Sequence, residues 1–109
     1  MYFLMVCRHH DGVDEKRGSV RAEHRKWVVS GGEGSASVLI GSATLGEDGN
    51  ANGNFGVLEA KDAASARAFA EGDPYNRAGI VAAIEITPLP DTFQAHRISE
   101  PMSGVRPGS

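Results

Sequence analysis

The chain has 109 residues, of which 40% are hydrophobic and 23% charged, as expected for a single globular domain. The net charge of −3 gives no basic surface for nucleic acid, and the longest strongly apolar run, residues 1–7, is far below the roughly 20 residues of a membrane helix, so neither partner is expected. A single cysteine excludes an internal disulfide and favours a reducing cytoplasm.

The first predicted element is a strand over residues 2–8, which is short and rich in strand-forming residues. Successive side chains of a strand point to opposite faces, and here the residues on both faces are apolar. Tyr2, Leu4 and Val6 share one face, and Phe3, Met5 and Cys7 share the other. Burial at Cys7 predicts a small hydrophobic residue and not a reactive thiolate. The polar residues 9–12 that follow predict a surface turn.

A helix is predicted over residues 19–29, where apolar residues recur with helical spacing. Val20, His24, Trp27 and Val28 fall at i, i+4, i+7 and i+8 and so form one stripe. Ser19 or Asp14 could cap the start of this helix, and the Gly31-Gly32 pair is expected to end it.

Two strands are predicted over residues 38–44 and 54–60, and the loop between them contains Asp-Gly and Asn-Gly pairs that favour a hairpin turn. The loop also matches the EF-hand calcium pattern at residues 48–59, with its ligands at Asp48, Asn50, Asn52 and Glu59. An EF-hand needs an incoming helix, whereas the preceding residues favour a strand. A hairpin is therefore the expected structure, and a calcium-binding loop is a minor alternative.

A second helix is predicted over residues 63–71, capped by Asp62 and anchored by Phe69. The sequence Gly72-Asp73-Pro74 ends it. A fourth strand follows over residues 80–86, in which alternation would place four side chains on one face: Ile80, Ala82, Ile84 and Ile86. Residues 1–89 are therefore expected to form the domain, and the Pro- and Gly-containing residues 90–109 a C-terminal tail or arm.

The order of elements, β-α-β-β-α-β, predicts an α+β fold of the ferredoxin-like type, with a four-stranded antiparallel sheet and two helices on one face. Such a sheet leaves its other face bare, yet the first strand is apolar on both faces. The second face therefore needs a cover, and the same sheet of another subunit would supply it. We expect a homodimer in which the two sheets pack face to face.

His24 and Asp73 are the candidate catalytic pair. His24 is the titratable residue on the apolar stripe of the first helix, and an imidazole can act as a general acid or base near neutral pH. Asp73 ends the second helix, which lies beside the first in this fold, so its carboxylate could orient the imidazole. A buried histidine bonded to a backbone carbonyl remains an alternative for His24, as does an N-cap of a short turn at residues 74–77 for Asp73.

The sequence resembles the YciI-like (YCII-related) family over about residues 2–89. The resemblance rests on Arg21-Ala-Glu-His24, Ile40-Gly41-Ser42, Asp73-Pro74-Tyr75 and Ala78-Gly79, and the chain has Gly41-Ser42 where the family usually has Gly-Pro. It implies a dimeric ferredoxin-like α+β fold with a His24/Asp73 site and Arg21 nearby. Ser42 and Tyr75, which lie in these motifs, are added as candidate substrate-binding residues. One branch of the family resembles dehydrochlorinases of chlorinated hydroxyhydroquinones.

No cofactor or metal is expected. His9-His10-Asp11 has metal-binding side chains, but neighbours on an extended segment point apart. The sequence thus predicts a lyase or isomerase that acts on a small polar molecule with a cyclic or aromatic skeleton, and the family resemblance implies that it could be dehydrochlorinase-like. His24 would move a proton, Asp73 would orient His24, and Arg21 would bind an anionic oxygen. The alternative is a non-catalytic small-molecule-binding or pathway-partner module.

Overall fold

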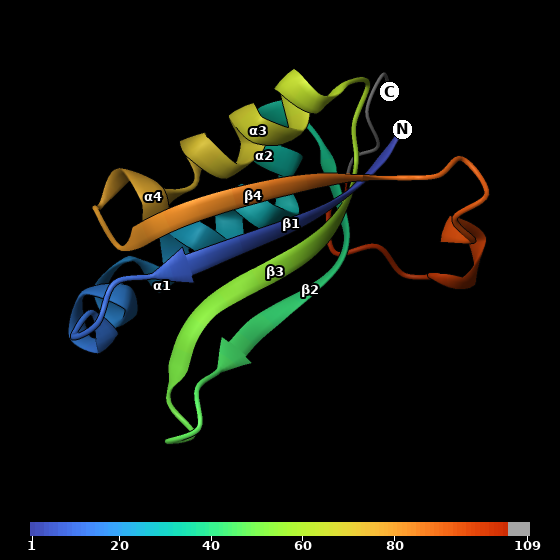
Figure 1. Cartoon of the computed structure of the whole chain (residues 1–109). Coiled ribbons are helices and arrows are strands. Elements are labelled where there is room, and N and C mark those ends of the chain that lie inside the picture. Colours follow the sequence, from blue (N-terminus) through green and yellow to red (C-terminus); the bar gives the residue numbers. More distant parts are fainter. Residues whose placement is uncertain (105–109) are drawn as a thin grey trace.

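A computed structural model describes residues 1–104. Its elements in chain order are β1 (Tyr2–His9), α1 (Asp14–Val29), α2 (Gly31–Gly34), β2 (Ser37–Leu45), β3 (Ala51–Glu59), α3 (Ala63–Gly72), α4 (Pro74–Arg77), β4 (Val81–Leu89) and the 3₁₀ helix η1 (Ala95–Arg97). The strands form one antiparallel sheet in the order β2-β3-β1-β4. The helices α1 and α3 lie together on one face of this sheet (Figure 1), which confirms the predicted ferredoxin-like arrangement.

The core lies between the helices and one face of the central strand β1. Phe3, Met5 and Cys7 from this face are buried, and Phe69 of α3 packs into the same cluster. Burial raises the pKa of the Cys7 thiol to about 12, so Cys7 behaves as the small hydrophobic residue that the sequence predicted. Trp27 joins α1 to α3, because its indole Nε1 donates a hydrogen bond to the Phe69 carbonyl at 2.9 Å.

The first helix is longer than predicted. It begins at Asp14 and not at residue 19, and neither predicted cap is used. The N-cap position is Val13, Asp14 pairs with Arg17 at 2.5 Å, and the Ser19 hydroxyl donates to the Lys16 carbonyl. The early turns are polar on most sides, which hides their helical period in the sequence. The predicted end is confirmed: the chain leaves α1 after Val29.

The fourth strand begins one residue later and runs further than predicted, over Val81–Leu89. The predicted shared face is wrong at Ala82, which is exposed, whereas Val81 packs against the core. The register against β1 shifts between Arg8 and His9, so Val81 lies opposite His9. Such an irregularity inserts one residue and reverses the alternation beyond it.

The loop between β2 and β3 is a hairpin, as expected, and does not form an EF-hand. Residues 51–59 are extended in β3, so Glu59 lies at the opposite end of that strand from the turn that holds Asp48. The Asp48 carboxylate instead accepts a hydrogen bond from the Asn50 backbone at 3.0 Å. The calcium-binding alternative is therefore not supported.

The sheet face away from the helices, here called the outer face, is apolar along its centre. Strand alternation and register place Leu4, Val6, Ile40, Phe55 and Val57 on it. Most of these side chains are half-buried, and Ile40 is 48% exposed. The expectation that the first strand is apolar on both faces is thus met.

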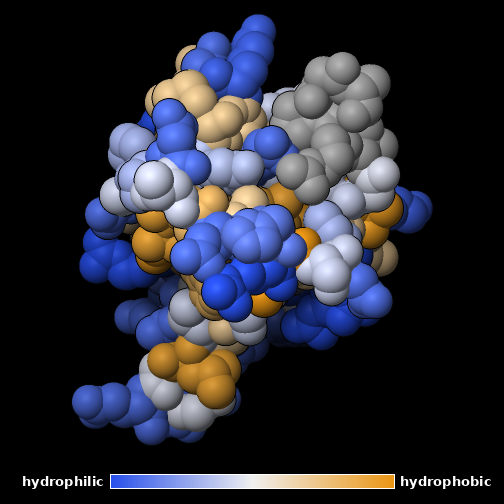
Figure 2. Space-filling view, turned by 90° about the vertical axis from the view of Figure 1, so that its right-hand side faces the viewer, coloured by the Kyte–Doolittle hydropathy of each residue, from blue (hydrophilic) through white to orange (hydrophobic). Residues whose placement is uncertain are grey.

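The segment after β4 packs back onto the domain. Phe93 lies against Tyr2 with ring centroids 5.4 Å apart. Ser103 is 4% exposed and bridges two elements, since its hydroxyl donates to the Val28 carbonyl at 2.6 Å and accepts from the Val38 backbone at 2.7 Å. Figure 2 views the end of the molecule where this segment turns back and shows hydrophilic residues in front of smaller apolar areas. Over residues 1–104, no helix is long and apolar enough to cross a membrane.

Candidate functional site

A pocket of about 500 Å³ opens between α1 and the β2-β3 half of the sheet. Residues from both ends of the chain line it: Met5, His9, Arg17, Arg21, His24, Arg25, Val28, Val29, Val38, Gly41, Ser42, Ala43, Ala51, Gly53, Asn54, Phe55, Gly56, Phe69, Asp73, Tyr75 and Met102. Its glycines belong to the sheet wall, where a Cβ on Gly53 would meet the Cys7 carbonyl oxygen at 2.2 Å. At Gly53, and likewise at Gly41, the backbone of the neighbouring strand thus leaves no room for a side chain.

His24 and Asp73 meet in this pocket. The His24 Nδ1 atom lies 2.9 Å from each carboxylate oxygen of Asp73. The side chains are 18% and 8% exposed, respectively. The His24 ring also stacks on Tyr75, with centroids 4.0 Å apart and an interplanar angle of 9°. The imidazole is therefore fixed at one nitrogen and one face, and Nε2 is the nitrogen left for exchange of a proton with a ligand.

Asp73 is positioned by the break between α3 and α4. It is the N-cap of α4, and its carboxylate oxygen Oδ1 accepts a hydrogen bond from the Tyr75 backbone at 2.8 Å. Pro74 follows at the first helical position, where its missing N–H costs nothing. The predicted cap is confirmed, and the same carboxylate contacts His24.

The predicted substrate-binding residues Arg21, Tyr75 and Ser42 differ in their exposure and in their contacts within the pocket. Arg21 lines it from the exposed side of α1, one turn before His24. Tyr75 is 6% exposed and supports the His24 ring. Ser42 lines the pocket, but its hydroxyl donates to the Ala43 carbonyl at 2.9 Å, and alternation with Gly41 directs its side chain toward the outer face. A substrate-binding role for Ser42 remains a prediction.

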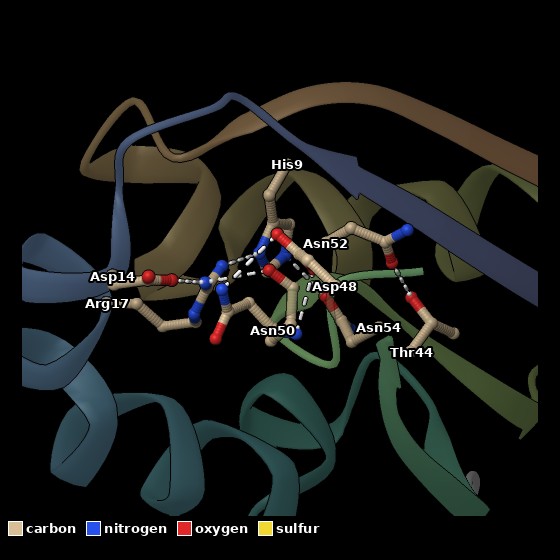
Figure 3. A network of polar contacts seen from close by, with 9 residues as sticks. His9, Asp14, Arg17, Thr44, Asp48, Asn50, Asn52 and Asn54 are labelled. Carbon is tan, nitrogen blue, oxygen red and sulfur yellow. Dashed lines mark hydrogen bonds and ion pairs between the residues drawn. The ribbon is translucent and has the colours of Figure 1, made fainter. Parts of the chain in front are cut away.

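A second polar cluster, formed by His9, Arg17 and Asn54, lines the same pocket (Figure 3). Arg17 Nη1 contacts His9 Nδ1 at 2.5 Å, and His9 Nε2 contacts Asn54 Oδ1 at 2.8 Å. Arg17 also donates to the Ala51 carbonyl at 3.1 Å. His9 and Arg17 are 8% and 6% exposed. The predicted turn at residues 9–12 was therefore wrong at His9, which ends β1 inside the pocket.

The sequence contains one signal that could have found this cluster. Arg17 lies four residues before Arg21 and seven before His24, so a helix that starts at Asp14 places all three on one stripe. The start predicted at residue 19 left Arg17 outside the helix. His9 and Asn54 meet through the pairing of β1 with β3, a contact between residues far apart in the chain.

The pocket is lined by apolar side chains together with charged ones, of which more are cationic than anionic. Its ionised lining residues comprise the guanidinium groups of Arg17, Arg21 and Arg25 against the carboxylate of Asp73. Burial, followed by the nearby Arg17 charge, lowers the pKa of His9, although the Asn54 hydrogen bond acts in the opposite direction. Within the described chain, no group of three or more His, Cys, Asp or Glu residues could hold a metal ion. An anionic ligand is the class that this field attracts.

Fold and pocket together define a small α+β domain with a buried histidine–carboxylate pair in a ligand-sized cavity. A family model, YCII-related domain, matches residues 1–90, and the chain belongs to this family. A solved structure is similar over 83% of this chain and 94% of its own, with 25% identity and a TM-score of 0.70: 5-chloro-2-hydroxyhydroquinone dehydrochlorinase (TftG) from Burkholderia phenoliruptrix AC1100, in complex with 2,5-dihydroxybenzoquinone. A search of curated proteins gave no match.

Proposed function

We propose that this protein is a lyase of the dehydrochlorinase type that acts on a small, oxygenated six-membered ring. The observation that carries the proposal is the His24 imidazole, held at Nδ1 by both oxygens of a buried carboxylate inside the pocket. The cationic lining and the similarity to a dehydrochlorinase bound to a dihydroxybenzoquinone support the same ligand class. No cofactor is part of the proposal.

In the proposed reaction the substrate loses HCl without net oxidation or reduction. A ring hydroxyl gives up its proton as the ring takes a keto form, and the carbon that bears chlorine gains a proton. Chloride then leaves with the electron pair of the C–Cl bond as a second hydroxyl loses its proton and becomes a carbonyl. Each proton movement needs an acid–base group in reach.

His24 Nε2 is assigned to the proton transfers because Nδ1 is engaged with Asp73. Asp73 is a positioning residue that fixes the ring orientation and balances the charge of the imidazolium when it forms. Arg21 lies one turn away on the same helix and would bind an anionic ring oxygen, as a guanidinium does with two donors. Tyr75 stacks on one face of the imidazole and so fixes the plane of the ring.

The test is turnover of 5-chloro-2-hydroxyhydroquinone, followed by chloride release and quinone absorbance. His24→Gln should lower kcat at least roughly 100-fold, since a positioned general acid–base group contributes 10²- to 10⁴-fold. Asp73→Asn should also lower kcat, while it preserves the α4 cap because asparagine caps as well as aspartate. His96→Gln is the matched control, since His96 is exposed in η1 and does not line the pocket.

Full turnover by His24→Gln would reject the assigned role. Absence of chloride release by the unchanged protein, together with tight binding of 2,5-dihydroxybenzoquinone, would support a non-catalytic binding module instead.

We also propose that two copies pair through the outer face of the sheet. Its central side chains are apolar and only half-buried in a single chain. Exposed apolar surface of this kind is characteristic of protein interfaces, and a two-fold axis would allow the same face of each copy to cover the other.

A further inference from the structure

The cluster of His9, Arg17 and Asn54 contains buried polar side chains that the proposed chemistry at His24 does not use. Arg17 and His9 are both more than nine-tenths buried, and burying a charge is costly unless it is well bonded. Arg17 satisfies part of this need through Asp14, His9 and the Ala51 carbonyl. A buried guanidinium bonded to an imidazole in a pocket wall therefore calls for a functional explanation.

The protonation state of His9 follows from its partners. An arginine can only donate, so His9 Nδ1 must accept the hydrogen bond from Arg17 Nη1. A neutral imidazole with a free electron pair on Nδ1 carries its proton on Nε2, and Nε2 must then donate to its neighbour. That neighbour is the amide of Asn54 at 2.8 Å, so its oxygen faces His9.

The orientation of the Asn54 side chain is thereby determined as well. With Oδ1 directed to His9, the two N–H groups of Nδ2 point away from His9. Across residues 1–104, the Nδ2 group makes no hydrogen bond, and Asn54 lines the pocket. The Tyr75 ring, which stacks on His24, also meets the His9 ring edge-on at 5.6 Å. The His9 and His24 imidazoles thus flank one aromatic ring, and Asn54, which is bonded to His9, lines the same cavity as His24.

We propose that Arg17 and His9 position the Asn54 amide as a hydrogen-bond donor to an anionic ring oxygen of the ligand. Asn54 is a specificity-determining residue in this proposal, and Arg17 and His9 are positioning residues that act through it. The ligand class is a planar ring with ionised oxygens on opposite sides, one directed to His24 and one to Asn54. This inference rests on the proposed function because it concerns the ligand class proposed for the same pocket.

The experiment measures the Kd of 2,5-dihydroxybenzoquinone by calorimetry. At neutral pH this probe carries ionised oxygens on opposite sides of its ring. Asn54→Asp keeps the size and the acceptor for His9 but replaces the donor with a negative charge. Loss of a hydrogen bond to a charged group predicts binding at least tenfold weaker. The matched control is Asn52→Asp on the same strand, because Asn52 is exposed, does not line the pocket and accepts from Thr44 through Oδ1.

A second measurement separates positioning from direct contact. The ¹⁵N chemical shifts of the His9 ring should show the neutral Nε2–H tautomer in the unchanged protein. Arg17→Met should abolish this tautomer preference and weaken binding of the probe, while His10→Gln, at the exposed neighbouring histidine, should do neither. Asn54→Ala replaces Asn54→Asp in the test if the aspartate variant does not fold.

The outcomes are distinct. Equal Kd values for Asn54→Asp and Asn52→Asp would overturn the inference and leave the role of His24 intact, since that role is tested by turnover. Failure of the unchanged protein to bind the probe would overturn both the inference and the proposed ligand class. A His9 ring with its proton on Nδ1 would overturn the assigned orientation of Asn54.

Discussion

The two pocket histidines receive opposite hydrogen bonds. Asp73 accepts from His24 Nδ1, whereas Arg17 donates to His9 Nδ1. One imidazole is thus paired with a carboxylate, and the other must stay neutral to accept from a cation. The same residue type serves two purposes in one cavity because its partners differ.

The neutral state of His9 predicts a pH dependence of stability. Its pKa in the folded protein lies below the ordinary value of 6.5, so the unfolded chain binds the proton more readily. Neutral His9 therefore contributes its full stabilisation above pH 6.5, and this stabilisation is lost as the pH falls through the lowered pKa. The free energy of unfolding then changes by at most about 1.4 kcal/mol per pH unit for one proton.

This dependence is measured by urea unfolding at a series of pH values from 7.5 downward. His9→Gln should reduce the fall in the free energy of unfolding on acidification, and His10→Gln, at an exposed position, should leave it unchanged. Parallel curves for His9→Gln and the unchanged protein would contradict a depressed pKa at His9.

At the scale of elements, the contact between α1 and α3 depends on a glycine. A Cβ added to Gly72 at the end of α3 would lie 2.6 Å from Trp27 Cζ2, whereas one added to Gly18 in the second turn of α1 would meet nothing within 4 Å. Gly72→Ala should therefore destabilise the fold by about 1–3 kcal/mol through overpacking.

Gly18→Ala is the matched control and should stabilise the fold by about 0.5–1 kcal/mol, because alanine loses less backbone entropy in a helix. Thermal and urea unfolding of both variants measure the difference. The same sign for both variants would refute the packing argument.

The sequence predicts elements well where local rules determine them. Asp62 caps α3 as predicted, since its side chain accepts from the Ser65 backbone at 2.8 Å. Asp73 and His24 could be brought together because the fold places both helices on one face. The sequence could not predict the reversed alternation at Ala82 or the pocket position of His9, because both depend on strand register.

The whole molecule has two unequal sides, with helices over one sheet face and a half-buried apolar outer face. If two copies pair through the outer face, a charge at its centre should separate them. Val6→Asp should convert a species with the mass of two chains into a single-chain species, as measured by light scattering after size exclusion. Ala64→Asp, exposed on α3, should leave the mass unchanged. A single-chain mass for the unchanged protein at micromolar concentration would exclude this pairing.

The return of the chain after β4 has a consequence for where the protein can be shortened. The family match ends at residue 90, but Met102 lines the pocket and Ser103 joins α1 to β2. A fragment cut at the family boundary would keep the whole sheet and both long helices, yet lose part of the cavity rim and the hydrogen bonds that tie the end of α1 to an edge strand. A substitution at Met102 would therefore change the rim of the cavity while it leaves the sheet and the His24–Asp73 pair in place.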